Sequence, residues 1–349
     1  MSRIRKGLIA VATLVAVTMA TSQQTTASSS WSFTDDSTNL GLTGVSPHVE
    51  RTGSVDRLWY SGGPGGTSVA DCNSSGSCTT VAANWGTPIN DVTFATFGGV
   101  KRAYFKKMDP MSGTQAVYSA PCLTADCVSI GAATLTSEQM KVSSSMRAWG
   151  VPDAVELPGG AGVRIYIVES PTMTSSCPEK VASYTSTDGV NFSKDAGYRF
   201  SKDGFVDTEI LRANTGSWLM IMADGPGCGS TQKLYVSEST DGLSWSNPAV
   251  LTGSDKSRLD PTGYETAPGS NTFKIYFASS SGGKDSDYKI GSGTLKVGAS
   301  ATAGTTTAAT KAKIGAACTK AGAKASITIS KKKTTLTCKT VKKKLVWSK

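Results

Sequence analysis

The chain of 349 residues is long enough for one large domain with flanking segments. Its formal net charge of +10 comes from 36 basic and 26 acidic residues. All the acids lie in residues 31–310, whereas residues 311–349 hold 12 basic residues and no acid. Because the basicity is confined to a short tail, it does not indicate a nucleic-acid-binding surface on the body, and we expect no nucleic acid among the partners.

The N-terminus has the pattern of a secretory signal peptide. A basic start precedes an apolar run, Leu8–Met19, that is too short to span a bilayer comfortably. Small residues after this run offer cleavage sites. We therefore expect a signal peptide over residues 1–27 and a secreted, extracellular protein. The alternative is an uncleaved membrane anchor.

The eight cysteines of an exported chain suggest four disulfides. Two of the expected pairs lie within single short loops, and one lies in the tail. A zinc site is disfavoured, because it would need histidines at short spacings and His48 is the only histidine. The expected pairs are Cys72/Cys78, Cys122/Cys127, Cys177/Cys228 and Cys318/Cys338.

From residue 45 onward the sequence repeats, and an acid marks the repeat. Asp153, Asp207 and Asp260 are 54 and 53 residues apart, each ahead of a turn and an alternating strand-like run. Two degenerate copies precede them, one with Asp91 and one in which Pro47 stands in the Asp position. The expected units are residues 45–88, 89–148, 149–203, 204–257 and 258–298.

A second marker repeats in step with the first. The stretch STDGVNF, Ser186–Phe192, recurs 53 residues later as STDGLSW, Ser239–Trp245. Asp-Gly between strand-like runs favours a tight turn, because Gly accepts a positive φ and Asp can bond its own backbone. We therefore expect Asp188 and Asp241 to be structural. In the first two units a close pair of cysteines stands about where this turn lies.

Each unit contains about four short strand-like runs and hardly any helical periodicity. One four-stranded sheet cannot bury both faces alone, but five arranged radially bury them against one another. The sequence therefore predicts an all-β fold, a five-bladed β-propeller over residues 28–298, with a β-sandwich as the alternative. Cys177 and Cys228 are 51 residues apart, so they would join equivalent loops of neighbouring blades.

In a propeller the first strand of each blade lines the central channel, so the recurrent acids should meet at one mouth of it. Clustered carboxylates repel, and a neutral carboxyl group beside an ionised one suits general acid/base chemistry. Glycoside hydrolysis is the reaction class that uses two carboxylates with little else. The alternative is structural, since an acid at a strand start can accept hydrogen bonds from backbone amides. The acids concerned are Asp91, Asp153, Asp207 and Asp260.

The pattern Asp153, Gly-Gly, Arg164–Ile167 and then Ser-Thr-Asp-Gly resembles the five-bladed propellers of the superfamily of glycoside hydrolase families 32, 43, 68 and 130. The Ser-x-Asp-Gly turns also resemble sialidase Asp-boxes. The resemblance covers residues 45–298. It implies an active site in the central funnel, with an Asp base, a second Asp that tunes the pKa and orients the sugar, and a Glu acid.

On this resemblance Asp153 matches the tuning Asp, and Asp207 falls near the position of the acid, with Glu209 two residues further on. The base of family 43 comes from the first blade, where Pro47 stands in this chain. Asp91 or Asp260 would therefore have to supply the base. The site is either rearranged or lost.

We expect Trp149, His48 and Tyr264 to bind substrate, and an oligo- or polysaccharide to be the partner. Aromatic rings stack on sugars, although Trp149 could equally pack between blades. A lone histidine is more often a polar or hydrogen-bonding residue. No cofactor is expected and no metal ligands are predicted, but the sequence leaves open a calcium ion in the channel.

Beyond the propeller, residues 299–313 form an Ala/Thr-rich linker. Residues 314–349 carry two Lys-Lys-Lys runs between β-prone segments and predict a small basic β-hairpin clamped by Cys318/Cys338. This tail resembles short Lys-rich, Cys-paired C-terminal modules of exported actinobacterial proteins. Its expected partner is an anionic cell wall or extracellular polymer, with a solvated basic tail as the alternative. We expect a monomer.

Three functions follow from these features. The first is a glycoside hydrolase that uses the channel-mouth carboxylates, which would need two carboxyl groups facing one cavity, about 5 Å apart if retaining or roughly 6.5–9.5 Å apart if inverting. The second is a non-catalytic propeller that binds glycans or the cell surface, with aromatic residues at the funnel mouth and acids engaged in backbone hydrogen bonds. The third is a structural envelope protein with a plugged funnel.

Overall fold

The computed structural model describes most of the chain between residues 31 and 348. The expected signal peptide and linker, Trp149 and Cys318 lie outside the described residues. Residues Ser30–Gly298 form one compact unit, and the C-terminal strands belong to a second. The described ranges are 31–36, 39–62, 66–83, 85, 88–108, 114–143, 150–170, 176–214, 217–281, 287–297, 324–329, 332–341 and 344–348.

No helix among these residues is long and apolar enough to cross a membrane.

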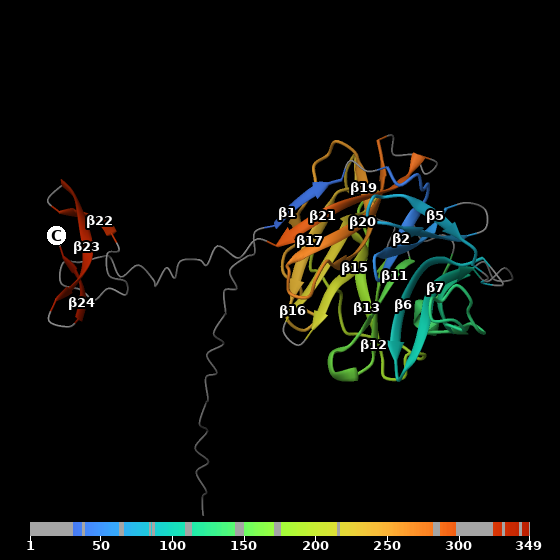
Figure 1. Ribbon diagram of the computed structural model, residues 1–349. Helices are drawn as coiled ribbons and strands as arrows, with labels where there is room; N and C mark the ends of the chain where they lie inside the picture. Colours follow the sequence, from blue (N-terminus) through green and yellow to red (C-terminus); the bar gives the residue numbers. More distant parts are fainter. Residues whose placement is uncertain are drawn as a thin grey trace, which may run out of the picture. The chain divides into compact units, whose positions relative to one another are not determined.

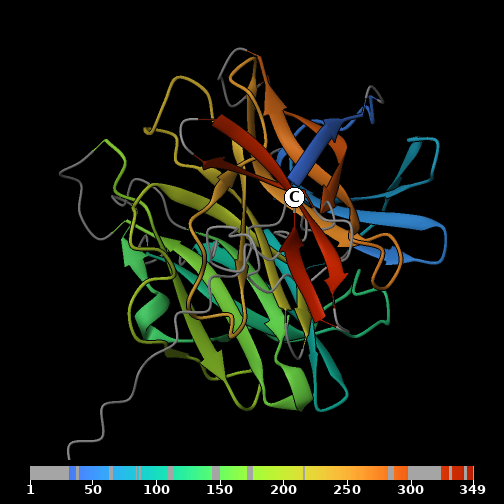
Figure 2. The ribbon, with the colours of Figure 1, turned by 90° about the vertical axis from the view of Figure 1, so that its left-hand side faces the viewer.

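Within the described part of the larger unit, five antiparallel sheets lie around a common centre (Figures 1 and 2). This arrangement confirms the five-bladed β-propeller. The first blade comprises β2 (Val45–Thr52), β3 (Val55–Ser61), β4 (Thr67–Cys72) and β5 (Cys78–Val81). The second comprises β6 (Asn90–Phe97), β7 (Val100–Met108), β8 (Thr114–Pro121), β9 (Thr134–Leu135) and β10 (Val142–Ser143), with the short 3₁₀ turn η1 (Glu138–Met140).

The third and fourth blades repeat the same order of strands. The third comprises β11 (Gly150–Glu156), β12 (Val163–Glu169), β13 (Lys180–Ser186) and β14 (Ser193–Lys194), with η2 (Pro158–Gly160) between its first two strands. The fourth comprises β15 (Phe205–Asn214), β16 (Ser217–Asp224), β17 (Leu234–Ser239) and β18 (Ala249–Val250).

The fifth blade is completed by a strand from the other end of the chain. Its own strands are β19 (Ser257–Glu265), β20 (Thr272–Ser280) and β21 (Lys289–Val297). β1 (Trp31–Asp35) pairs antiparallel with β21, beside which it lies in Figure 1. The repeat in the sequence did not predict this strand. The pairing closes the ring of blades, because it ties the chain ahead of the first blade to the last one.

The hydrophobic core lies between blades. The second strand of a blade packs against neighbours on both faces, and β12 (VRIYIVE) and β16 (SWLMIMAD) are accordingly almost continuous runs of buried residues. Tyr104 of the second blade and Ile165 of the third belong to one buried cluster. Leu219 of the fourth blade and Phe273 of the fifth belong to another. Each blade therefore completes the core of the next.

The two Ser-Thr-Asp-Gly turns are structural, as the sequence predicted. The Oδ1 atom of Asp188 accepts the N–H groups two and three residues further on, at 2.8 and 2.7 Å. Asp241 does the same, at 2.8 Å for both. A tyrosine of the preceding blade donates its hydroxyl to the glycine carbonyl of each turn, Tyr104 at 2.8 Å and Tyr166 at 2.6 Å. The turns therefore also fasten neighbouring blades.

Three of the expected disulfides are present in the propeller. Cys72–Cys78 and Cys122–Cys127 each close a short loop after the third strand of a blade, and Cys177–Cys228 joins the third blade to the fourth. Cys338 is also disulfide-bonded. Disulfides of this kind are typical of an oxidising, extracellular compartment.

The C-terminal unit contains β22 (Lys324–Ile329), β23 (Lys332–Val341) and β24 (Lys344–Ser348). They form a three-stranded antiparallel sheet, so the expected hairpin is extended by a third strand. Of the two Lys-Lys-Lys runs, Lys332 and Lys333 begin β23 and Lys344 begins β24.

Candidate functional site

The first strand of each blade carries one extra residue near its start. The pairing with the second strand shifts by one residue there, for example between Val45 and His48 in β2. Within each of these bulges one non-glycine residue has a positive φ, between 45° and 55°. These five equivalent residues, here called the first belt, are Ser46, Asp91, Val151, Asp207 and Asp260.

A second set of equivalent residues stands two positions further along each strand. Pairing with the second strand resumes at these residues, directly after each bulge. This second belt consists of His48, Thr93, Asp153, Glu209 and Thr262.

This register corrects the alignment expected from the sequence. Asp153 is equivalent to Glu209 and His48, and its blade places Val151 in the first belt. Pro47 does not stand in the Asp position of the first blade, which is occupied by Ser46. The first blade therefore contributes a serine and a histidine to the belts and no carboxylate.

Carboxylates of the first belt accept backbone N–H groups of the following blade. Asp260 accepts the N–H of Ser46 at 2.8 Å. Asp91 accepts the N–H of Val151 at 3.4 Å. Asp207 accepts the N–H of Asp260 at 3.4 Å. These bonds link the second blade to the third, the fourth to the fifth, and the fifth to the first.

The second belt repeats this arrangement one step further along. Its side chains again accept the N–H group of a residue in the following blade. Asp153 accepts from Ile210 at 2.7 Å, Thr93 from Ala154 at 3.2 Å and Thr262 from Val49 at 3.1 Å.

The position of the first strands explains why side chains that accept hydrogen bonds recur in the belts. Each is the inner edge of its sheet, and the N–H groups along that edge have no partner strand. A buried N–H without an acceptor costs free energy, about 1–3 kcal/mol. Acidic and hydroxyl side chains from the neighbouring blade supply the acceptors. An acid therefore recurs from blade to blade because the same edge recurs.

A lysine neutralises part of the first belt. Lys106 of β7 forms an ion pair with Asp91, and the charges of Asp207 and Asp260 also act on it. Burial alone would raise the pKa of Asp91, but the ammonium group of Lys106 lowers it below its usual value. Burial raises the pKa of Asp260 to about 6. Burial and the charge of Asp260 raise the pKa of Asp207 well above its usual range, so these two acids share a proton.

The second belt holds another proton-sharing pair. Burial raises the pKa of Asp153 to about 6. Burial and the neighbouring Asp153 raise the pKa of Glu209 well above its usual value, and the two side chains are hydrogen-bonded to each other. His48 Nδ1 lies 3.9 Å from Glu209 Oε2. Burial lowers the pKa of His48 to about 3, so its imidazole is neutral near pH 7.

The geometry limits what Asp153 and Glu209 can do as a pair. The two carboxyl groups of a glycosidase flank the scissile bond, with about 5 Å between them in retaining enzymes and more in inverting ones. Carboxylate oxygens of Asp153 and Glu209 lie within 4.8 Å of each other, so the two acids titrate as one coupled pair. Both side chains are also buried, with exposed fractions of 4 % and 8 %.

Three second-belt residues have the donor types for a metal ion. A ring nitrogen of His48 and carboxylate oxygens of Asp153 and Glu209 lie within 4.8 Å of one another. Calcium takes six to eight oxygen ligands, of which this set offers few. One imidazole with carboxylates is closer to the donor set of a transition metal.

The other sequence candidates lie elsewhere. Tyr264 stands two residues beyond Thr262 of the second belt, and its hydroxyl donates to Asp56 at 2.8 Å. Trp149 lies outside the described residues. The sequence reasoning missed Lys106, since one lysine in a strand is usually a solvated residue.

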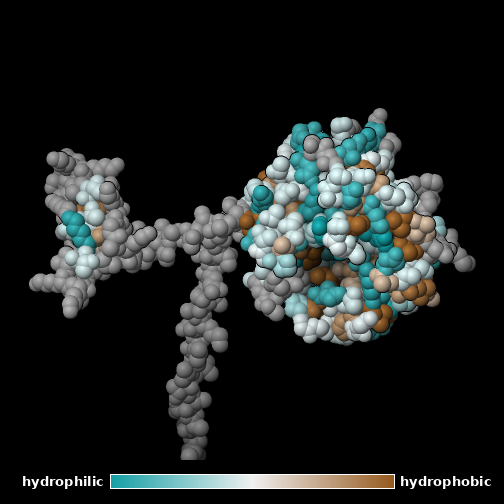
Figure 3. Space-filling model, viewed as in Figure 1, coloured by the Kyte–Doolittle hydropathy of each residue, from teal (hydrophilic) through white to brown (hydrophobic). Residues whose placement is uncertain are grey.

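The outer surface of the propeller is a mixture of hydrophilic and hydrophobic residues on the face shown in Figure 3.

The chain thus has the fold of the five-bladed propellers found among glycoside hydrolases. An endo-arabinase from Bacteroides thetaiotaomicron is 11% identical over 74% of this chain and 96% of that chain, with a TM-score of 0.51. An α-L-arabinofuranosidase from Podospora anserina, solved with cellotriose, is 9% identical over 76% of this chain and 96% of that chain, with a TM-score of 0.54.

A family 43 enzyme from Xanthomonas citri, solved with xylose, is 10% identical over 74% of this chain and 89% of that chain, with a TM-score of 0.51. At these identities the likeness shows the fold and not the activity. Neither a protein-family model nor a curated protein matches the chain.

Proposed function

We propose that the chain is a secreted carbohydrate-binding propeller whose central carboxyl groups join blades and do not hydrolyse a glycosidic bond. The hydrogen bonding of the belts carries this proposal. Four central acids, Asp91, Asp153, Asp207 and Asp260, each accept a backbone N–H of the following blade. Each of these acids therefore already has a structural partner in the folded protein.

The first blade supports the same proposal. It contributes Ser46 and His48 to the belts, so the blade that supplies the base in family 43 offers no carboxylate there.

Carbohydrate is the ligand class that the fold favours. Similar propellers have been solved with cellotriose and with xylose, and we extend that class of ligand to this chain. Export is supported by the disulfides of the propeller and by the signal-peptide pattern of residues 1–27.

Electrophoresis of the mature protein through gels containing arabinan, xylan or soluble cellulose derivatives tests the proposal. We expect at least one polysaccharide in the gel to slow the migration of the native protein. The reducing-sugar content of that polysaccharide should stay constant. Unchanged migration in every gel would refute carbohydrate binding.

The tail supports a second contact, with an anionic polymer of the envelope. Its Lys-Lys-Lys runs are Lys331–Lys333 and Lys342–Lys344, of which Lys332, Lys333 and Lys344 belong to strands of the three-stranded sheet. We expect salt-sensitive retention on immobilised polyanion that is weakened when these lysines are replaced by glutamine. Replacing propeller lysines such as Lys202 and Lys289 is the matched control and should have less effect.

A hydrolase remains the second candidate because one observation favours it. Glu209 has a raised pKa beside Asp153, and a neutral carboxyl group next to an ionised one is the arrangement of a general acid. Such an enzyme would show a rate that falls as Glu209 loses its proton at high pH.

A further inference from the structure

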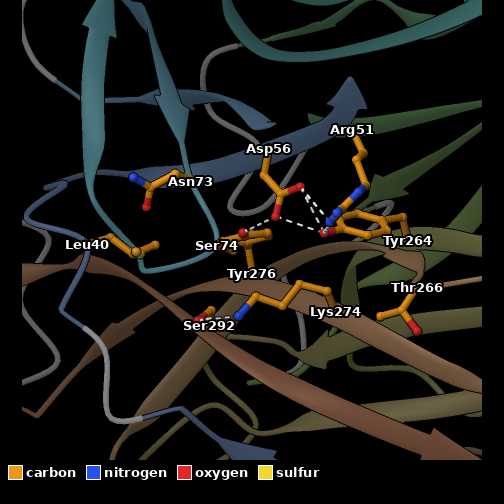
Figure 4. A pocket seen from close by; sticks show the side chains of 11 residues that line it. Leu40, Arg51, Asp56, Asn73, Ser74, Tyr264, Thr266, Lys274, Tyr276 and Ser292 are labelled. Atoms are coloured by element: carbon orange, nitrogen blue, oxygen red, sulfur yellow. Dashed lines mark hydrogen bonds and ion pairs between the residues drawn. The ribbon is translucent and has the colours of Figure 1, made fainter. Parts of the chain in front are cut away.

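A pocket of about 210 Å³ lies at the seam between the first and fifth blades, beside the C-terminal ends of β2 and β19 (Figure 4). Arg51 and Asp56 line it from the first blade, and Tyr264 and Lys274 line it from the fifth. Nothing in the belt arrangement assigns a role to this pocket.

A buried carboxylate organises one side of the pocket. Asp56 is 7 % exposed and accepts the hydroxyl of Tyr264 at 2.8 Å and that of Tyr276 at 2.5 Å. Arg51 donates to the same carboxylate at 3.3 Å and lies over the Tyr264 ring, 5.2 Å from its centroid. Figure 4 shows Arg51 and both tyrosines converging on Asp56. These side chains are therefore held in place before any ligand binds.

The positive charges of the pocket are balanced. Arg51 is paired with Asp56, and Lys274 is paired with Asp36 at 2.5 Å and donates to Ser292 at 3.0 Å. The pocket therefore presents many polar groups but little net charge. This combination disfavours a charged ligand and suits one with several hydroxyl groups.

The opposite rim is a rigid turn. Asn73 and Ser74 belong to the loop closed by Cys72–Cys78. Asn73 Oδ1 accepts the N–H groups of Ser75 and Ser77 at 3.0 and 3.1 Å, which fixes the turn. Both Asn73 and Ser74 are exposed, so they can meet a ligand from solvent.

The fold itself explains Tyr276 but not Tyr264. Tyr276 pairs with a second-belt residue, as Tyr104 and Tyr166 do, and like them it fastens its blade to the next. Tyr264 pairs with Lys274, and the corresponding residues of the first three blades, Glu50, Ala95 and Val155, are not aromatic. An aromatic ring at this position is therefore a local feature of the seam.

We propose that this pocket binds one uncharged sugar ring of a glycan. The proposal rests on the carbohydrate-binding function proposed above and places a subsite at the seam, beyond the second belt along β2 and β19. The volume is below the roughly 300–1,000 Å³ of pockets for drug-sized ligands, which fits a single ring. The face of the Tyr264 ring that Arg51 does not cover offers an aromatic surface for the C–H face of the sugar, and Arg51, Asn73 and Ser74 offer hydrogen bonds to its hydroxyls.

Isothermal titration of the full mature chain with cellotriose and with xylose tests the subsite. Ser74→Trp places a large side chain on the exposed rim without removing an internal contact. Ser201→Trp makes the same change at an exposed serine of another loop and is the matched control. Tyr264→Phe removes only the hydroxyl and keeps the ring.

We expect Ser74→Trp to lower the association constant by about ten-fold or more, Tyr264→Phe to lower it by a smaller factor, and Ser201→Trp to leave it unchanged. Wild-type affinity in Ser74→Trp would overturn the subsite and leave carbohydrate binding standing. If neither sugar binds to the wild-type chain, although a polysaccharide does slow its migration in gels, the subsite proposal is refuted for these rings and carbohydrate binding stands. If neither sugar binds and no polysaccharide slows migration, the proposed function is refuted as well.

Discussion

Val151 is the least expected member of the first belt. Its φ is 45°, a region that β-branched residues rarely adopt, whereas Asp tolerates it better. Because the bulge recurs in every blade, the third blade adopts it even with a valine at the position. The backbone of the bulge is thus imposed by the fold and not by the residue that occupies it.

Val151→Asn should therefore stabilise the protein, by about 1 kcal/mol, because Asn accepts a left-handed conformation more readily than Val. Val155→Asn is the matched control, since Val155 is a half-buried valine in the same strand without a positive φ. Chemical denaturation of both variants provides the comparison. Equal destabilisation by the two substitutions would show that the conformation of Val151 is not strained.

The belt acids also predict how stability depends on pH. The folded-state pKa of Asp153 and Asp260 is raised to about 6, so the folded chain holds protons that the unfolded chain releases near pH 4. Stability should therefore fall as pH rises from about 4 to 6. His48 acts in the opposite direction, because its pKa is lowered to about 3. Because His48 is one group and at least two acids act in the other direction, the net stability should fall with rising pH, as the acids predict.

Asp207→Asn should flatten this slope, because it removes the acid of the coupled pair whose pKa burial and the charge of Asp260 raise well above its usual range. Asp188→Asn is the control, since hydrogen bonds within its turn lower the pKa of Asp188 and its titration lies below this window. Melting temperatures from pH 4 to pH 7 give the slopes. A wild-type stability that rises over this range, or an unchanged slope in Asp207→Asn, would count against the proton-sharing pair.

Among the structural elements, the Ser-Thr-Asp-Gly turns are the most regular. Gly242 has φ 70°, and a Cβ there would lie 2.8 Å from the hydroxyl of Tyr166. The same tyrosine donates to the carbonyl of Gly242. Two features therefore require glycine at this position: the positive φ of the backbone and the close approach of the neighbouring blade.

Gly242→Ala should destabilise the protein more than Gly159→Ala. Both glycines have φ 70°, so each alanine incurs about 1 kcal/mol of backbone strain. Only Gly242 has atoms within reach of the added methyl group, whereas nothing lies within 4 Å at Gly159. Thermal unfolding of the two variants checks the difference. Equal losses would mean that the blade contact adjusts without cost.

The five-bladed architecture could be predicted because the same pattern of strands and turns recurs from blade to blade. Alternating strands and Asp-Gly turns recur at a spacing of 53 residues, and this spacing gave the five blades and the disulfide Cys177–Cys228. β1 could not be predicted in the same way. It lies ahead of the first repeat, and its pairing with β21 depends on closing the ring, which no local pattern encodes.

The site was less predictable, because a bulge is invisible in a single sequence. Asp153 and Asp207 are 54 residues apart, close to the true spacing of 53 between Asp207 and Asp260, and they therefore looked equivalent. The register shows that Asp153 belongs with Glu209 instead. A difference of two residues moved an acid from one belt to the other, and only strand pairing reveals it.

In this account, the side chains of the two belts at the centre of the propeller hold neighbouring blades together. Incubation of the mature wild-type protein with arabinan, xylan and cello-oligosaccharides, beside Asp153→Asn and Glu209→Gln, tests this most directly. We predict no release of reducing sugar by any of the three proteins and a changed unfolding free energy in both variants. Turnover by the wild type that disappears in Glu209→Gln, with the melting temperature unchanged, would contradict the account and establish a hydrolase.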